Sequence, residues 1–231
     1  FSNELSYAGK IKPLRDDSEV QRRPPTVVYA VKSFGKSGKV NEEEATVVAS
    51  LLVAASQQPE YKDATFGVIS MLGVDQALYV DMLLRRYMPP EDYIRGQVLC
   101  GDSAQFQGDE RDVMFLSMVD VPSDKGGPLS LRAEEGHDDM FKKRYNVAAS
   151  RARDQMWVVH SLDPDVDLKQ DDIRRRLILH ARDQHLYNQA RREQEQKIES
   201  EFERQVFERL VQTGYRVKTQ WLVGAYRIDM V

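Results

Sequence analysis

The sequence of 231 residues has one cysteine, Cys100, and only four histidines. A single cysteine excludes an internal disulfide framework and is typical of a reducing compartment, so we expect a cytoplasmic protein. The histidines, at positions 137, 160, 180 and 185, lack the i, i+4 spacing with which a helix presents two metal ligands. We therefore expect no complete metal site in this chain.

Long apolar runs and a strong excess of charge are also missing. No apolar stretch reaches the roughly 18 residues of a membrane span, and no signal peptide opens the chain, so we expect no membrane partner. The formal net charge is −4, so contacts with nucleic acid must come from local basic patches. The chain has no initiator Met and ends on the strand-like residues 227–231, and we expect both ends to lie within a longer protein.

The sequence does contain short β-branched segments that alternate with helical patterns. After an irregular lead-in over residues 1–25, Asn41 is a plausible N-cap, because three glutamates follow it where the helix dipole favours anions. A second helix is expected over 74–87. Strands are predicted at 26–31, 65–70, 97–100, 113–119 and 156–159. This alternation predicts an α/β fold, a parallel sheet flanked by helices, whose ligands lie outside the carboxyl ends of the strands.

The composition changes after Pro164. Residues 171–210 are rich in Arg, Glu and Gln and predict one long helix or two, interpreted as a solvated linker. Two strand-like segments follow, at 215–221 and 226–231, and look like the opening of another domain. We divide the chain into a sheet domain over 1–165, a helical linker over 166–198 and a truncated α/β appendage over 199–231.

The first candidate motif is a near P-loop. Ala30-x-x-x-x-Gly35-Lys36-Ser37 follows a strand, with Ala in place of the first Gly. A working P-loop places its amides and its Lys at the start of a helix, whereas here the N-cap comes only at Asn41. We interpret the segment as a flexible basic loop and keep a self-contained phosphate cradle, built on Lys36 and Ser37, as the alternative.

The second motif is Gln107-Gly108-x-Glu110-x-Asp112, in a polar loop between two apolar strands. Gly108 permits a close backbone approach or a positive φ angle. Gln107 can donate and accept hydrogen bonds, and Glu110 can accept from a sugar hydroxyl or steady an arginine. The alternative is an acidic hairpin loop without a ligand.

The third motif runs from Tyr145 to Arg153. Asn146 is a plausible N-cap, and the alanines after it predict a short helix that carries Arg151 and Arg153. Because two residues one apart do not share a helix face, one arginine can point at a ligand while the other braces the fold. The planar fork of a guanidinium suits a polyphosphate. The alternative is a surface pair of arginines on an alanine-rich helix.

In this order, the segments 107–112 and 146–153 resemble motifs V and VI of superfamily 1 helicases, in the branch with the Upf-, Dna- and Sen-type enzymes. Other segments agree with the pattern. Phe1-Ser2-Asn3 resembles the opening of that family's second RecA-like domain, Asn41-x-x-Glu44-Ala45 its first helix, and Gly67-Val68-Ile69-Ser70 with Gln76 its motif IV. The resemblance covers residues 1–162. The sequence departs from it at Ser70-Met71-Leu72, where relatives have Thr-Pro-Tyr.

The resemblance implies half of an ATP-driven motor. ATP and Mg²⁺ would be held mainly by the N-terminal RecA-like domain of the same parent chain, and this domain would supply the arginine finger. Arg151 matches the finger, which neutralises charge on the γ-phosphate, and Arg153 assists or braces it. The remaining matches are Gln107, Gly108 and Gln76 at the nucleotide, Glu110 beside the arginines, and Ser70 and Ser103 at the backbone of single-stranded DNA, with RNA also possible.

The C-terminal end carries a second resemblance. Ser200-x-Phe202-Glu203 and Gly224-x-Tyr226-Arg227-Ile228-Asp229 resemble the start of a very-short-patch-repair type PD-(D/E)XK nuclease. That fold implies that Glu203 and Asp229 surround a divalent metal that activates water, with a second acidic pair expected after Val231. The alternative is a helix and hairpin with a purely structural role.

Three functions are thus expected from the sequence. The first is a motor half of an ATP-dependent DNA helicase, inactive by itself, with Arg151 at the edge where the strand carboxyl ends gather. The second is a self-contained NTPase that uses Lys36 and Ser37. The third is a non-enzymatic module for nucleic acid or partner binding, which is favoured if Arg151 lies buried against the chain's own carboxylates.

Overall fold

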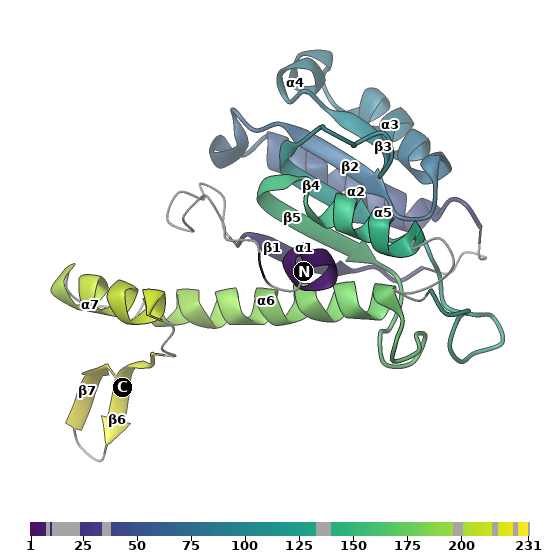
Figure 1. Cartoon of the computed structure of the whole chain (residues 1–231). Coiled ribbons are helices and arrows are strands. Elements are labelled where there is room, and N and C mark those ends of the chain that lie inside the picture. Colours follow the sequence, from purple (N-terminus) through teal and green to yellow (C-terminus); the bar gives the residue numbers. More distant parts are fainter. Residues whose placement is uncertain are drawn as a thin grey trace. The chain divides into compact units, whose positions relative to one another are not determined.

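A computed structural model describes residues 1–7, 10, 24–33, 38–132, 140–195, 201–213, 217–223 and 226–230 (Figure 1). The chain divides into two compact units, residues 1–182 and 183–231. In the described part of the chain, no helix combines the length and the apolar character that crossing a bilayer requires.

The first unit is built on a five-stranded sheet. All of its strand pairs are parallel, and the order is β1-β5-β4-β2-β3. The strands are β1 (Thr26–Ala30), β2 (Phe66–Ser70), β3 (Leu99–Asp102), β4 (Arg111–Ser117) and β5 (Ala152–His160). Each of the five predicted segments forms a strand, so the α/β parallel sheet is confirmed. The strand ends define two opposite borders of the sheet, which we name the carboxyl edge and the amino edge.

Helices cover both faces of this sheet (Figure 1). Along a strand, successive side chains alternate between faces, and the two hydrophobic clusters follow this alternation. On one face, Val68 and Phe115 pack with α2 (Glu42–Ser56) and α3 (Val74–Tyr87). On the other, Ile69 and Leu116 pack with residues of α1 (Ser2–Tyr7), α5 (Met140–Ala149) and the start of α6 (Ile173–Glu195). The short helices η2 (Pro59–Tyr61) and α4 (Pro90–Arg95) complete the connections.

The helix signals in the sequence are largely confirmed. Asn41 is the N-cap of α2, and its Oδ1 accepts a hydrogen bond from the N–H of Glu44 at 3.0 Å. Helix α3 has the predicted bounds, and it ends before Pro89 and Pro90. The prediction of an irregular lead-in is wrong at its start, because α1 occupies residues 2–7. Residues 8, 9 and 11–23 lie outside the described part.

Helix α6 differs from the solvated linker that its composition predicts. Its first turns bury Ile173, Leu177, Ile178 and Ala181 in the core of the first unit. The compact unit therefore extends beyond the expected boundary at residue 165, because these apolar positions recur at helical spacing within an otherwise charged segment.

The second unit contains the end of α6, helix α7 (Glu201–Gln212) and two strands. The predicted hairpin is present, because β6 (Thr219–Val223) pairs antiparallel with β7 (Tyr226–Met230). The charged stretch thus forms two helices. Residues 196–200, between them, lie outside the described part.

Candidate functional site

The second and third motifs meet at the amino edge of the sheet. The N–H of Arg111 donates to the carbonyl of Arg151 at 3.1 Å, beside the first residue pair of β4 and β5, Arg111 and Ala152. Glu110, Arg151 and Arg153, from segments far apart in the sequence, therefore lie close together.

The local structure that presents the two arginines differs from the prediction. Asn146 does not begin a helix, because α5 already begins at Met140. The earlier start follows from Tyr145 and Ala148, which are fully buried on one helix face. Helix α5 ends at Ala149, so Arg151 lies in the turn after it and Arg153 lies within β5. Arg151 and Arg153 therefore do not lie on the two faces of one helix that the sequence predicts. They lie in different elements, a turn and a strand.

The guanidinium of Arg151 is oriented by the end of its own helix. Its Nη2 donates to Ser150 Oγ at 2.8 Å, and its Nε lies 3.2 Å from both Ser150 Oγ and the carbonyl of Val147. Ser150 Oγ in turn donates to that carbonyl at 2.9 Å. Among the described residues, no carboxylate forms an ion pair with Arg151. Its positive charge is therefore positioned without being neutralised, an arrangement that fits an anion.

Arg153 has the neighbours that Arg151 lacks. Its Nε lies 3.5 Å from Glu110 Oε2, and its Nη1 lies 3.7 Å from Asp112 Oδ1. The side chains of Arg153 and Glu110 are both about half exposed, so these pairs contribute little to stability. They do orient the two side chains, which agrees with a bracing role for Arg153.

The loop over residues 103–110 presents Gln107 and Gly108. It starts at the carboxyl end of β3 and finishes at the amino end of β4, on the opposite edge. Phe106 is fully buried and anchors the loop over Gly67, where an added Cβ would lie 3.0 Å from Phe106 Cε1. Gly108 has φ +93°, so the expected positive φ is confirmed, and Gln107 is exposed to solvent.

Arg111 supports this loop and was not identified from the sequence. Its Nε donates to the carbonyl of Gln97 at 3.0 Å, and its Nη1 donates to the carbonyl of Glu110 at 2.8 Å. Nη1 also lies 3.3 Å from Asp109 Oδ1. The sequence could have indicated this role, because Arg111 is the one cation among the acidic residues 109–112 and therefore has carboxylate acceptors close by.

Three other predicted residues lie at the carboxyl edge, away from the arginines. Ser70 ends β2 and pairs with Asp102 of β3, so Ser70 and Ser103 belong to neighbouring strand ends. Both are buried, and Ser70 Oγ has no hydrogen-bond partner in the described part of the chain. The expectation that Arg151 lies at this edge is wrong, because its helix precedes β5 and the turn therefore opens at the amino edge.

Gln76 also lies near the carboxyl edge but is directed inward. It is fully buried, and its Oε1 accepts from the N–H of Asn41 at 2.8 Å. Its Nε2 donates to the carbonyl of Asn41 at 3.2 Å and to Ser117 Oγ at 3.0 Å. Both ends of the amide therefore clamp α3 to the start of α2 and to β4.

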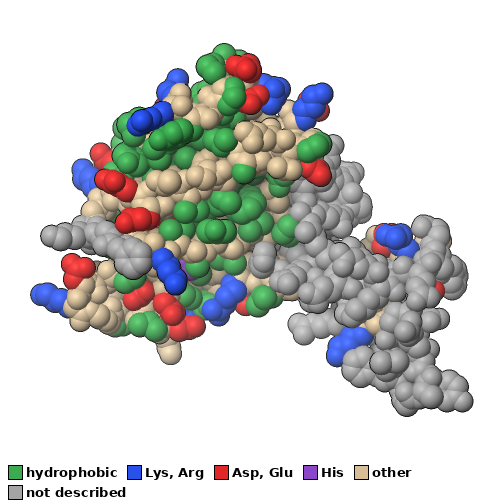
Figure 2. All heavy atoms as spheres, turned by 180° about the vertical axis from the view of Figure 1, so that it is seen from behind, with side chains coloured by type: hydrophobic (Ala, Val, Ile, Leu, Met, Phe, Trp, Pro, Cys, Tyr) green, Lys and Arg blue, Asp and Glu red, His purple; other side chains and the backbone are tan. Residues whose placement is uncertain are grey.

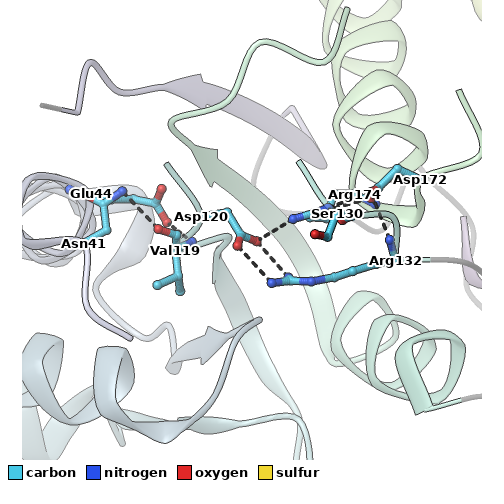
Figure 3. A network of polar contacts seen from close by, with 8 residues as sticks. All are labelled: Asn41, Glu44, Val119, Asp120, Ser130, Arg132, Asp172 and Arg174. Atoms are coloured by element: carbon cyan, nitrogen blue, oxygen red, sulfur yellow. Dashed lines mark hydrogen bonds and ion pairs between the residues drawn. The ribbon is translucent and has the colours of Figure 1, made fainter. Parts of the chain in front are cut away.

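Glu44, which the sequence predicts only as an anion in the first turn of a helix, makes polar contacts that were not predicted. Its Oε1 accepts from the N–H of Val119 at 2.8 Å (Figure 3). Oε1 also accepts from Ser117 Oγ at 2.7 Å, and Oε2 accepts from Ser161 Oγ at 3.0 Å. Burial raises the pKa of this carboxyl to about 7, although the three donors act in the opposite direction. Val119 has φ +71°, a strained backbone that this contact helps to hold.

A buried ion-pair network follows directly after Val119 in the chain (Figure 3). Asp120 lies 2.8 Å from Arg132 and 3.2 Å from Arg174, and Arg174 lies 2.7 Å from Asp172. Arg174 Nη2 also donates to the carbonyl of Ser130 at 2.6 Å. The network attaches the loop after β4 to the start of α6.

The near P-loop and the nuclease-like residues are described only in part. Lys36 and Ser37, the near P-loop, lie outside the described residues. Glu203 lies on α7 and Asp229 within β7, but the side chain of Asp229 is outside the described part. In that part, no group of three or more His, Cys, Asp or Glu side chains is placed to hold a metal ion.

A comparison with protein families identifies the domain that contains the sheet. A family model described as an AAA domain matches residues 1–163, which include all five strands of the parallel sheet. A search of curated proteins found no match.

Proposed function

Because the chain belongs to the AAA domain family, whose match fits a helicase-like P-loop NTPase domain, we propose that residues 1–165 are the second motor domain of an ATP-dependent DNA helicase. The observation that supports this most is Arg151. Its guanidinium is held by Ser150 and Val147 at the amino edge, without a carboxylate partner among the described residues. A positioned, uncompensated cation next to an exposed loop suits the γ-phosphate of a nucleotide.

In this proposal, ATP and its Mg²⁺ bind mainly to the N-terminal RecA-like domain of the same parent chain, which faces the amino edge. Mg²⁺ supplies charge neutralisation between the phosphates. Arg151 stabilises the charge that develops on the transferred phosphoryl group, while Glu110 and Arg153 hold the rim around it. Gln107 and Gly108 contact the nucleotide from the loop.

Single-stranded DNA is the proposed track, with Ser70 and Ser103 as contacts to its backbone at the carboxyl edge. The assignment of Ser70 rests on the resemblance to motif IV, since its hydroxyl is buried. Gln76 is left out of the nucleotide contacts, since its amide is engaged within the chain.

The test is a finger substitution in the full-length parent. Arg151→Ala is expected to lower ATP turnover on the order of a thousandfold while binding of a fluorescent ATP analogue changes little. Arg151→Lys should also fail, because an ammonium cannot replace the planar fork. Arg153→Ala is the matched control and should lower turnover less than about tenfold, since this side chain is half exposed and braced.

The chain of 231 residues alone should show no ATP hydrolysis. Hydrolysis by this chain that is lost in Lys36→Ala would favour the self-contained NTPase instead. Unchanged turnover in Arg151→Ala would refute the motor assignment. We propose no activity for the nuclease-like end, because the side chain of Asp229, one of its two predicted metal ligands, lies outside the described residues.

A further inference from the structure

The outer surface of α2 and α3 carries an apolar trough that the motor chemistry does not use. It measures about 640 Å³ and lies between the two helices. Figure 2 views the molecule from behind, on the side of α2, where hydrophobic side chains gather on the surface. The α2 wall is made of small residues, among them Ala49, Ser50 and Ala54. The α3 wall presents larger ones, including Met82 and Tyr87.

Two apolar side chains at the trough, Met82 and Tyr87, lie outside the hydrophobic core of the domain. The core beneath is filled by Leu52, Val80 and Leu84, which are fully buried. Met82 is 50% exposed and Tyr87 63% exposed. Large apolar side chains that remain exposed beside a hollow are typical of an interaction site.

The dimensions of the trough suit a helix. On α2 the lining residues recur at helical spacing from Thr46 to Gln57, and on α3 from Tyr79 to Tyr87. The longer wall spans about 16 Å, or three helical turns. An amphipathic helix presents apolar side chains at i, i+3, i+4 and i+7 over the same length, and it packs into such grooves between helices.

The charge of the lining decides the chemistry of the occupant. Among the described residues, Arg86 is the one charged side chain that lines the trough. It is exposed, its guanidinium lies 5.4 Å from the centre of the Tyr87 ring, and it forms no ion pair with a described carboxylate. We propose that the trough binds an acidic amphipathic helix of a partner protein, with its apolar side chains against Met82 and Tyr87 and a carboxylate on Arg86.

Binding of a designed peptide to the 231-residue chain tests this proposal independently of ATP. The probe is a fluorescein-labelled amphipathic peptide of about 16 residues, with leucines on one face and glutamates beside them. A second peptide has lysines in place of the glutamates. By fluorescence anisotropy, the acidic peptide is expected to bind at least about tenfold more tightly than the basic one. Arg86→Glu should reverse that preference.

Two substitutions on α3 form a matched pair. Met82→Glu lies in the trough and should weaken binding of the acidic peptide about tenfold or more. Leu78→Glu introduces the same charge at an apolar side chain that is 58% exposed but outside the trough, and it should change the affinity less than about threefold. Ser50→Arg, which fills the trough from α2, gives a second loss-of-binding variant in case Met82→Glu does not fold.

Three results would overturn the proposal. One is equal affinity for the two peptides, or none for either. Another is an equal loss in Leu78→Glu and Met82→Glu. The third is a wild-type dimer, detected by sedimentation, that Met82→Glu separates into monomers, because the occupant would then be a second copy of this chain.

Discussion

At the scale of single residues, Glu44 makes the stability of the protein depend on pH. Its carboxyl is fully buried, and its pKa rises from the ordinary 4.5 to about 7. Between these values the folded chain keeps a proton that the unfolded chain releases. The contribution of Glu44 to the free energy of unfolding is therefore complete below pH 4.5 and decreases as the pH rises to 7, by about 3 kcal/mol.

Glu44→Gln should remove this decrease. An amide cannot ionise, and its oxygen can still accept from the N–H of Val119. Urea unfolding at pH 5, 6, 7 and 8 measures the effect. As the pH rises, the free energy of unfolding of the variant should increase relative to that of the wild type. Burial lowers the pKa of His160, so this residue makes the free energy of unfolding increase with pH. Its effect is the same in the wild type and in the variant and therefore cancels in the comparison. Glu42→Gln, on the exposed side of the same helix, is the control and should leave the pH dependence unchanged.

The sequence predicts the elements better than the direction of their polar side chains. Five strands, helix α3 and the Asn41 cap follow from local patterns. Gln76 and Glu44 do not, because a polar residue within an amphipathic helix has the same pattern whether it meets a ligand or an internal donor. The misplacement of Arg151 at the carboxyl edge was avoidable, because the predicted helix precedes its strand in the sequence, and the turn between them therefore opens at the amino edge.

At the scale of elements, Gly67 allows the loop over residues 103–110 to cross β2. An added Cβ would lie 2.8 Å from Met114 Cε and 3.0 Å from Phe106 Cε1, and both side chains are fully buried. Gly67→Ala should therefore lower the free energy of unfolding by about 1–3 kcal/mol. Chemical denaturation measures this.

Phe106→Leu provides the control for that variant. The smaller side chain relieves the contact with Phe106, while Met114 still crowds the new Cβ, so the double variant should be only slightly less destabilised than the sum of the two single variants. Additive effects would show that Gly67 and Phe106 do not share this space.

Helix α6 is attached to the first unit through Arg174, whose side chain is 2% exposed. Arg174→Met should cost about 3–5 kcal/mol, because it leaves the buried carboxylate of Asp172 without its cation. The neighbouring Arg175 pairs with the exposed Asp165, so Arg175→Met should cost less than about 1 kcal/mol. Thermal unfolding compares the two. Equal costs would contradict the importance assigned to the buried network.

At the scale of the whole molecule, the folded unit is longer than the family match. The match ends at residue 163, whereas the core continues through Ile173, Leu177, Ile178 and Ala181. The resemblance to helicase motifs also ends nearby, at residue 162. It does not reach α6, because the apolar residues of this helix lie in a charged segment without a recognisable motif.

A chain that ends at residue 172 should therefore fail to fold, whereas one that ends at residue 195 should fold. Burial of the four apolar side chains of α6 contributes roughly 1.5–3 kcal/mol for each of the larger ones, which together approaches the whole stability of a domain. Far-ultraviolet circular dichroism and thermal melting distinguish the outcomes. A cooperative transition in the shorter chain would show that α6 is dispensable.

The connection from β3 to β4 has eight residues and contains no helix, although it joins opposite borders of the sheet. Ser103 stands at one end of this segment and Glu110 at the other. The two borders of the sheet are therefore only eight residues apart along the chain, and the buried Phe106 fixes the middle of that segment. In the proposed motor, the segment would join Ser103 on the DNA side to Glu110 on the nucleotide side.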